Sequence, residues 1–249
     1  VGGDLVEVTS IIDNPNQDPH SYVATARDRL AVENADIVVM NGGGYDDFMQ
    51  ALVDQDETPG VTVDAYQAAG DDQVRNEHIW YDFVQVQDVG AVIAAAIETV
   101  DPSSADVGQQ NFDAFRHQLE ALTALSKDIV VGLDNLDVIE TEPIASYLLS
   151  SMGFNDITPL EFTKAVEEQR DIPATALKFV QEKIKYALIG FVAMNRATET
   201  SQTKALAEQC LTDGVAVLYF SELPPLDKSY VEWMNDNVQQ VRVLAGVGQ

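Results

Sequence analysis

The chain of 249 residues is 46% hydrophobic and carries 41 acidic against 14 basic side chains, a formal net charge of −27 at pH 7. Its length supports one large domain or two of ordinary size, each with a buried core. A surface with this negative charge repels nucleic-acid phosphates and anionic lipid head groups. Neither is therefore expected as a partner. No apolar run approaches the roughly 20 residues that a membrane-spanning helix needs, so the chain is expected to fold outside the bilayer.

A single cysteine, Cys210, excludes an intrachain disulfide and every CxxC motif. It lies in the helical pattern "ALAEQCLTDG", where a free cysteine is typically buried. The sequence shows no signal peptide, but it opens at "VGGDLVEV", which is typical of an interior start. An exported protein loses its leader peptide, so the lack of a signal peptide in this sequence is compatible with export.

The first half of the chain alternates short β-rich runs with helical patterns, which predicts β–α units and a mainly parallel sheet. Thr25 is placed to cap the first of these helices. A glycine-rich turn, "NGGG", follows the second predicted strand. The predicted elements are a strand at 5–12, a helix at 26–35, a strand at 36–42, a short helix at 46–53 and a strand at 61–65.

Residues 104–128 differ from their surroundings because they form one long amphipathic pattern. Their large apolar side chains follow each other at spacings of 3, 4, 3 and 3, which predicts a single apolar stripe on a helix. At about 1.5 Å per residue this helix is about 35 Å long, enough to reach from one lobe to another. The stripe consists of Phe112, Phe115, Leu119, Leu122 and Leu125.

The second half returns to the β–α alternation, so the predicted fold is α/β with two lobes. Each lobe is a mainly parallel sheet flanked by helices, and one long helix joins them. The predicted division is an N-terminal lobe at 1–103, an interlobe helix at 104–128 and a C-terminal lobe at 129–249. The strands of the second half are predicted at 137–141, 155–160, 186–194 and 216–220, and its helices at 143–153, 173–184, 203–214 and 229–246.

Four side chains of the kind that bind metals follow predicted strands, and ligands of open α/β sheets bind beyond the carboxyl ends of strands. His20 follows the first predicted strand, and His78 follows the third by way of an acidic loop at 67–76. Glu142 and Glu222 each come directly after a strand of the second half. The sequence thus places two imidazoles in one lobe and two carboxylates in the other.

This set has a chemical logic as one metal site. Imidazole suits transition metals of intermediate softness, and carboxylates shift the preference towards Mn²⁺ and Fe²⁺ while still admitting Zn²⁺. Two carboxylates would also neutralise a divalent ion that has lost its water. Ligands so far apart in sequence form a site only when both lobes are folded and face each other.

Each residue also has an ordinary structural interpretation. An isolated histidine is usually structural, and this applies to His20 and His78 alike. Glu142 precedes a proline and can begin a helix, where acidic residues are favoured. Glu222 can be an exposed loop carboxylate. His117 lies within the long helical pattern, away from any strand end, and is expected on the surface or between the lobes.

The chain resembles a known family at the segments where these residues lie. "DNPNQDPHSY" is similar to an Asp-Pro-His-(Ser/Thr)-Tyr stretch of that family, and "ADIVVMNG" to its Ala-Asp-hydrophobic strand that ends in Asn-Gly. "NEHIWYDF", "VIETEP" and "LYFSELPP" resemble the loops that carry its other ligands. The family is that of the solute-binding proteins of metal-ion ABC transporters, the zinc/manganese group, and the resemblance runs the full length of the chain.

The resemblance implies that His20, His78, Glu142 and Glu222 bind one divalent transition-metal ion in the cleft between the lobes. The ion, Mn²⁺ or Zn²⁺ with Fe²⁺ as a third candidate, is delivered to the membrane permease of an ABC transporter. The resemblance also implies an extracytoplasmic monomer, either periplasmic or a cell-surface lipoprotein that an N-terminal lipid attaches to the membrane.

Two departures from the family pattern bear on these expectations. Members normally have a further strand and helix before the position of Val1. Many zinc-dedicated members have a histidine-rich loop before the second ligand, whereas the loop at 67–76 has acids and no histidine. Together with Glu142 where many members have histidine, this favours Mn²⁺ or Fe²⁺ slightly over Zn²⁺.

Two alternative functions use the same residues or the same fold. A metal-dependent hydrolase needs an open coordination position and a general base. The chain has no HExxH, GxSxG, GxGxxG or P-loop motif, so no enzyme is predicted. A surface adhesin is the second alternative, and no residue pattern identifies a host ligand for it.

Overall fold

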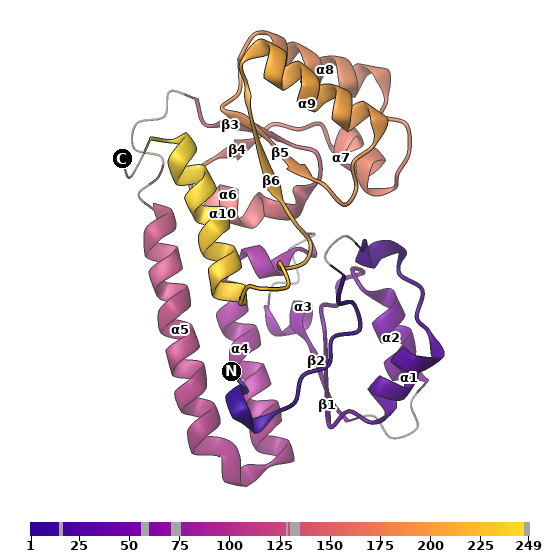
Figure 1. Cartoon of the computed structure of the whole chain (residues 1–249), viewed down its shortest axis with the longest axis vertical. Coiled ribbons are helices and arrows are strands. Elements are labelled where there is room, and N and C mark those ends of the chain that lie inside the picture. Colours follow the sequence, from indigo (N-terminus) through magenta and orange to yellow (C-terminus); the bar gives the residue numbers. More distant parts are fainter. Residues whose placement is uncertain (15–16, 56–59, 71–75, 128, 130–134, 247–249) are drawn as a thin grey trace. The chain divides into compact units, whose positions relative to one another are not determined.

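A computed structural model describes residues 1–14, 17–55, 60–70, 76–127, 129 and 135–246 (Figure 1). The chain divides into two compact units, Val1–Ala121 (unit 1) and Leu122–Gln249 (unit 2), and the boundary falls inside its longest helix. Both units contain a parallel sheet flanked by helices. The predicted α/β class, with two lobes joined by one long helix, is therefore confirmed.

Unit 1 is built on a parallel pair of strands in which Ile37 of β1 lies opposite Val61 of β2. Buried side chains of β1 pack with those of α1 and α2 on one face, where Val38, Met40 and Met49 form part of a small core. The predicted cap is present, because the Thr25 hydroxyl accepts a hydrogen bond from Asp28 N. The elements of unit 1 are α1 (Ala26–Glu33), β1 (Ile37–Met40), α2 (Asp47–Asp54), β2 (Val61–Asp64), α3 (Ala65–Ala68) and α4 (Phe83–Val100).

The strand predicted at 5–12 is wrong. After a 3-10 turn at Gly3–Leu5 the chain runs without strand assignment, and Val8 is 80% exposed. A strand needs a neighbour for its backbone N–H and C=O groups. Among the described residues of unit 1, β1 and β2 pair only with each other, so the alternating apolar pattern at 5–12 has no strand beside it.

Helix α4 is 18 residues long with a mean hydropathy of 1.4, enough by length and composition to cross a membrane, which was not expected from the sequence. It contacts both β1 and β2. At Gly90 it lies so close to α5 that an added Cβ would stand 3.2 Å from the ring of Phe112. These contacts show that one face of α4 packs within unit 1, where Gly90, Ala96 and Ile97 are buried, and a single helix of this composition is weak evidence for a membrane span.

The long helix α5 covers Ala105–Lys127, close to the predicted 104–128. Leu119 and Leu122 of the predicted stripe are buried, and Phe112 and Phe115 are half-buried. Both phenylalanine rings lie against Gly90 of α4, so the amino-terminal half of the stripe packs within unit 1.

Unit 2 is built on a four-stranded parallel sheet with the strand order β4-β3-β5-β6. All five residues of the central strand β5 are buried. Side chains of α7, α8 and α9 form the core on one face of the sheet, and α8 and α9 lie side by side there (Figure 1). The elements of unit 2 are β3 (Asp137–Glu140), α6 (Ser146–Ser151), β4 (Asn155–Asp156), α7 (Leu160–Glu167), α8 (Ala174–Lys185), β5 (Phe191–Asn195), α9 (Ser201–Asp213), β6 (Ala216–Phe220) and α10 (Tyr230–Leu244).

Three details of unit 2 refine the sequence prediction. β5 begins at Phe191, not at 186, because Ala187 has a φ of 47° and turns the chain between α8 and the strand. Gly214 ends α9 with a φ of 74°, as predicted. Cys210 is buried on that helix, also as predicted, and burial raises the pKa of its thiol to about 11.

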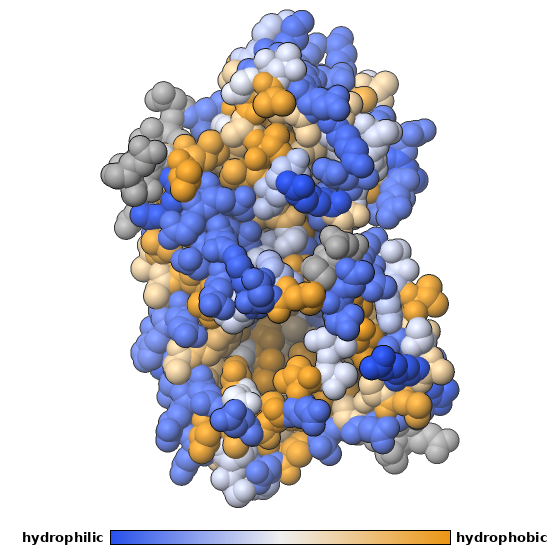
Figure 2. All heavy atoms as spheres, viewed as in Figure 1, coloured by the Kyte–Doolittle hydropathy of each residue, from blue (hydrophilic) through white to orange (hydrophobic). Residues whose placement is uncertain are grey.

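The exposed side chains reflect the composition. Figure 2 shows hydrophilic side chains over much of the visible face, with hydrophobic residues between them. This is the surface expected of a chain with a net charge of −27.

Candidate metal site

The Asp-Pro-His stretch fixes the backbone of His20 in unit 1. Asp18 is the N-cap of a 3-10 turn, η2 (Pro19–Ser21), and its Oδ1 accepts a hydrogen bond from His20 N at 2.9 Å. Pro19 follows the cap, where its fixed φ suits the turn. His20 is exposed, so the turn presents its imidazole to solvent.

His78 lies just before a second 3-10 turn, η3 (Ile79–Tyr81), and is only 1% exposed. Two hydrogen bonds reach the side-chain oxygen of Asn76: one from His78 N at 3.0 Å and one from the ring Nδ1 of His78 at 2.6 Å. The neighbouring carbonyl of Glu77 accepts a hydrogen bond from Asn41 Nδ2 at 2.9 Å, which ties this segment to the end of β1. The His78 ring is therefore held both from its own loop and from the sheet.

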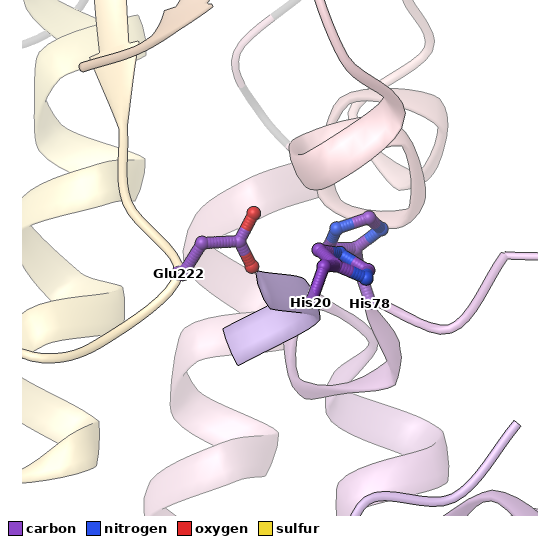
Figure 3. A group of neighbouring side chains, drawn as sticks. All are labelled: His20, His78 and Glu222. Atoms are coloured by element: carbon purple, nitrogen blue, oxygen red, sulfur yellow. The ribbon is translucent and has the colours of Figure 1, made fainter. Parts of the chain in front are cut away.

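The two imidazoles of unit 1 lie next to each other (Figure 3). Their ring centroids are 6.1 Å apart, and a ring nitrogen of one lies within 4.8 Å of a ring nitrogen of the other. Two nitrogens bound to one ion at about 2.1 Å each lie roughly 3–4 Å apart, so a separation within 4.8 Å is of the scale that such a site needs. Tyr45 packs edge-on against both rings, at 4.9 Å from His20 and 6.0 Å from His78.

The turn after β1 carries Tyr45 into this position. Asp46 is 9% exposed, and its carboxylate accepts hydrogen bonds from Asn41 N and Gly42 N, each at 2.8 Å. Burial raises the pKa of Asp46, while these backbone N–H groups oppose the rise. Gly43 has a φ of 67°, and a Cβ there would stand 2.7 Å from the ring of Tyr66, so the turn requires glycine.

The two predicted carboxylates of unit 2 lie at one edge of its sheet. Glu142 follows β3 and is 3% exposed, and it accepts a hydrogen bond from the Thr198 hydroxyl. Glu222 follows β6 and is 4% exposed, and its Oε1 accepts a hydrogen bond from Asn195 Nδ2 at 3.1 Å. The strands are parallel, so their carboxyl ends share an edge.

Each buried carboxylate is oriented by a neutral donor, a hydroxyl or an amide. Such a donor fixes the direction of the carboxylate oxygens. Figure 3 draws Glu222 on the loop that follows β6.

Glu140, a third acid at this edge, has a different environment. It is the last residue of β3 and fully buried, and Ser146 Oγ donates a hydrogen bond to its Oε1 at 2.9 Å. Burial, followed by the nearby charge of Asp156, raises the pKa of Glu140 to about 8, although the bond from Ser146 acts in the opposite direction. The raised pKa favours the protonated form of Glu140.

The predicted residues thus lie as two pairs. His20 and His78 are together in unit 1, and Glu142 and Glu222 are both at the carboxyl edge of the sheet of unit 2. His117 is exposed on α5, where its Nδ1 lies 3.1 Å from Glu120 Oε2, as expected of a surface residue. Residues 71–75 of the predicted acidic loop lie outside the described part of the chain.

Sequence reasoning missed the side chains that hold these ligands. Asn195 ends β5 and Thr198 follows it. Both residues therefore lie at the carboxyl end of a strand, the same kind of position that singled out Glu222 in the sequence. Asn76 stands two residues before His78, a spacing typical of a side chain that accepts a hydrogen bond from a nearby backbone N–H.

Known proteins resemble this chain over nearly its whole length. The manganese-binding lipoprotein MntA of Halalkalibacterium halodurans is 23% identical over 258 residues, covering 96% of this chain and 81% of that protein. A crystal structure of ZnuA superposes with a TM-score of 0.80 at 21% identity, covering 100% of this chain and 92% of the other. The solute-binding protein FpvC of Pseudomonas aeruginosa in complex with Mn²⁺ gives a TM-score of 0.78 at 22% identity, covering 98% and 92%.

The match to a family model defines the class, a solute-binding protein for metal-ion uptake that works outside the cytoplasm, and the solved structures share its fold. The model of the family described as "ZnuA: Zinc-uptake complex component A periplasmic" matches residues 1–243, and the chain belongs to that family.

Proposed function

We propose that this protein captures one divalent transition-metal ion with His20, His78, Glu142 and Glu222 and delivers it to the permease of an ABC transporter. The ion is cargo, so the protein binds and releases it without turnover. In this proposal the functional division is two lobes, 1–103 and 129–249, joined by the helix at 104–128. Four protein ligands close the coordination shell, whereas a catalytic metal keeps a position open for water.

The observation that carries the proposal is the imidazole pair. A ring nitrogen of His20 and one of His78 lie within 4.8 Å, and Asp18 and Asn76 hold the two residues by separate hydrogen bonds. Histidines that serve only the local structure have no need to converge in this way from turns 58 residues apart. The carboxylates of unit 2 support it, because Glu142 and Glu222 are both buried and each accepts a hydrogen bond that orients it.

We propose Mn²⁺ or Fe²⁺ ahead of Zn²⁺ as the cargo. Two carboxylates in the ligand set shift its preference towards the harder ions. Zn²⁺ also fits two nitrogens and two oxygens, and it stands above Mn²⁺ in the general order of affinity. The preference is therefore a matter of selectivity, and all three ions should bind. The protein is proposed to act as a monomer, anchored only through a lipid at its natural N-terminus.

Thermal unfolding of metal-stripped protein tests the ligand set. A ligand that binds only the folded state adds RT ln(1 + [L]/Kd) to the stability, about 2.7 kcal/mol at a hundredfold excess over Kd. Mn²⁺, Fe²⁺ and Zn²⁺ are each titrated into protein treated with EDTA, and the shift of the melting temperature is measured.

The variants His20→Ala and Glu222→Ala should each lose most of this shift. His117→Ala is the matched control, because its ring is 69% exposed and contacts Glu120 on the same helix, and it should keep the full shift. Equal losses in all three variants, or no shift with any of the ions, would overturn the proposal.

A further inference from the structure

We infer that two asparagines, Asn76 in unit 1 and Asn195 in unit 2, are positioning residues for the metal ligands His78 and Glu222. The side-chain oxygen of each asparagine accepts a hydrogen bond from a backbone N–H. This contact determines whether the amide oxygen or the amide nitrogen faces the metal ligand. Asn76 can only accept a hydrogen bond from its ligand, and Asn195 can only donate one. The inference rests on the proposed function, because it assigns roles around the same site.

The orientation of Asn76 follows from its contact with the backbone. His78 N lies 3.0 Å from the side-chain oxygen position of Asn76, and a backbone N–H can only donate, so the atom that faces it is the amide oxygen. The same oxygen lies 2.6 Å from His78 Nδ1. An amide oxygen has no proton to give, so Nδ1 of His78 carries the proton of this hydrogen bond.

This assignment fixes the tautomer of a neutral His78. With the proton on Nδ1, the lone pair of the ring is on Nε2, and Nε2 is the nitrogen that binds the ion. Ligating histidines commonly donate their other N–H to a carbonyl or carboxylate, which holds the ring in place and raises its basicity. Asn76 has this role for a ring that is 1% exposed.

The orientation of Asn195 follows from the same reasoning with the opposite result. Ala197 N donates to Asn195 Oδ1 at 3.0 Å, which identifies that atom as the amide oxygen. The amide nitrogen, Nδ2, therefore faces Glu222 and donates to its Oε1 at 3.1 Å. Asn195 is 2% exposed and Glu222 is 4% exposed, so the bond is shielded from water and holds the plane of the carboxylate.

One substitution has opposite consequences at the two positions. In Asn76→Asp both contacts remain, because a carboxylate oxygen accepts from the backbone N–H and from Nδ1 alike. In Asn195→Asp the bond from Ala197 N remains, but the second oxygen of the new carboxylate faces Glu222 Oε1 and repels it. Purely structural roles would predict that both changes are tolerated, because both preserve the contact with the backbone.

The first test is the tautomer of His78 in the metal-free protein, measured by long-range ¹H–¹⁵N correlation spectra of ¹⁵N-histidine-labelled protein. The chain has three histidines, so a His78→Ala spectrum identifies the signals. We expect the proton on Nδ1 in the wild type and a mixture of tautomers in Asn76→Ala. A wild-type His78 with its proton on Nε2 would overturn the inference for Asn76, whether or not the protein binds metal.

The second test measures the affinity for Zn²⁺ by competition with a chelator. Loss of a contact that orients a ligand costs about 10–100-fold in metal affinity, and this loss is expected of Asn76→Ala, Asn195→Ala and Asn195→Asp. Asn76→Asp should retain the wild-type affinity. Equal losses in Asn76→Asp and Asn195→Asp, or wild-type affinity in Asn195→Asp, would overturn the inference.

The chain offers a matched control for the charge. Asn155 Nδ2 donates to Asp137 Oδ1 at 2.8 Å at the start of β3 and β4, the opposite edge of the same sheet. Asn155→Asp places a second carboxylate beside Asp137 at an exposed position away from the site and should leave the affinity unchanged. If Asn195→Asp does not fold, Asn195→Ala replaces it, since it removes the donor without adding a charge. Wild-type protein that binds neither Zn²⁺ nor Mn²⁺ would refute the proposed function, and the tautomer measurement would still decide the role of Asn76.

Discussion

The turn that supports the imidazole pair depends on one buried carboxylate, and its removal should weaken unit 1 measurably. Asp46 accepts hydrogen bonds from Asn41 N and Gly42 N at 2.8 Å each. In Asp46→Ala both N–H groups lose their acceptor while the turn stays partly buried. Asn41 also donates to the carbonyl of Glu77, so the change should reach the segment that carries His78.

The magnitude follows from the two bonds and the cost of burying the acid. Hydrogen bonds to charged groups contribute about 1.5–3 kcal/mol each. Part of this gain is offset by desolvation of Asp46, which is 9% exposed and has a raised pKa. We expect Asp46→Ala to lower the free energy of unfolding of unit 1 by about 3 kcal/mol. The neighbouring Asp47 is exposed in the first turn of α2, and Asp47→Ala should cost only about 0.3–1 kcal/mol.

The chain allows each unit to be followed separately, because it has two tryptophans and each unit contains one. In a Trp233→Phe background only Trp80 remains, and its ring lies 4.8 Å from that of Tyr45, next to the altered turn. With a urea dependence of about 2 kcal/mol per molar, the unfolding midpoint of the metal-free protein should fall by about 1.5 M. Equal midpoint shifts in Asp46→Ala and Asp47→Ala would refute the reasoning.

Three further predictions concern unit 2. The raised pKa of Glu140, about 8 in the folded state against 4.5 as its ordinary value, means that the folded protein holds a proton that the unfolded chain releases. The stability of metal-free protein should therefore fall as pH rises between these two values, by at most about 1.4 kcal/mol per unit, and urea unfolding of Glu140→Gln should remove this dependence. Cys210 should resist a thiol reagent at pH 8 until denaturant unfolds the protein, because its side chain is buried and burial raises the pKa of its thiol to about 11. Fast labelling of the native protein would contradict this prediction. On α9, Leu206→Ala should cost about 2–5 kcal/mol in thermal unfolding, since Leu206 is 1% exposed, whereas Leu211→Ala at 86% exposure should be nearly neutral.

The elements that the sequence predicts well are those whose signals are local. The cap at Thr25 and the stop at Gly214 both depend on a few adjacent residues, and both are present. The long helix follows from a stripe of regular spacing. In unit 2, Glu142 and Glu222 follow strands of one parallel sheet as predicted, since such a sheet brings its carboxyl ends to one edge. His20 was placed by a strand at 5–12 that the structure lacks, so its position beside His78 did not follow from that rule.

The sequence predictions fail where the structure of a segment depends on residues that are distant in the chain. The run at 5–12 alternates as a strand does, yet whether it becomes one depends on a neighbouring strand elsewhere in the chain. β5 starts later than predicted because the chain turns at Ala187, which has a φ of 47°. The residues around Ala187 are apolar and continue the strand pattern, so the sequence gives no signal of this turn. The raised pKa of Glu140 could not be predicted either, since it results from complete burial at a strand end that only the folded sheet creates.

Four hydrogen bonds that orient the proposed ligands each join two residues of the same unit. A chimaera that joins the imidazole half of this chain to the carboxylate half of a relative should therefore inherit each half-site intact. Recombination between paralogues should then exchange one proposed ligand pair in a single genetic step. The four bonds are those of Asp18 with His20, Asn76 with His78, Thr198 with Glu142 and Asn195 with Glu222.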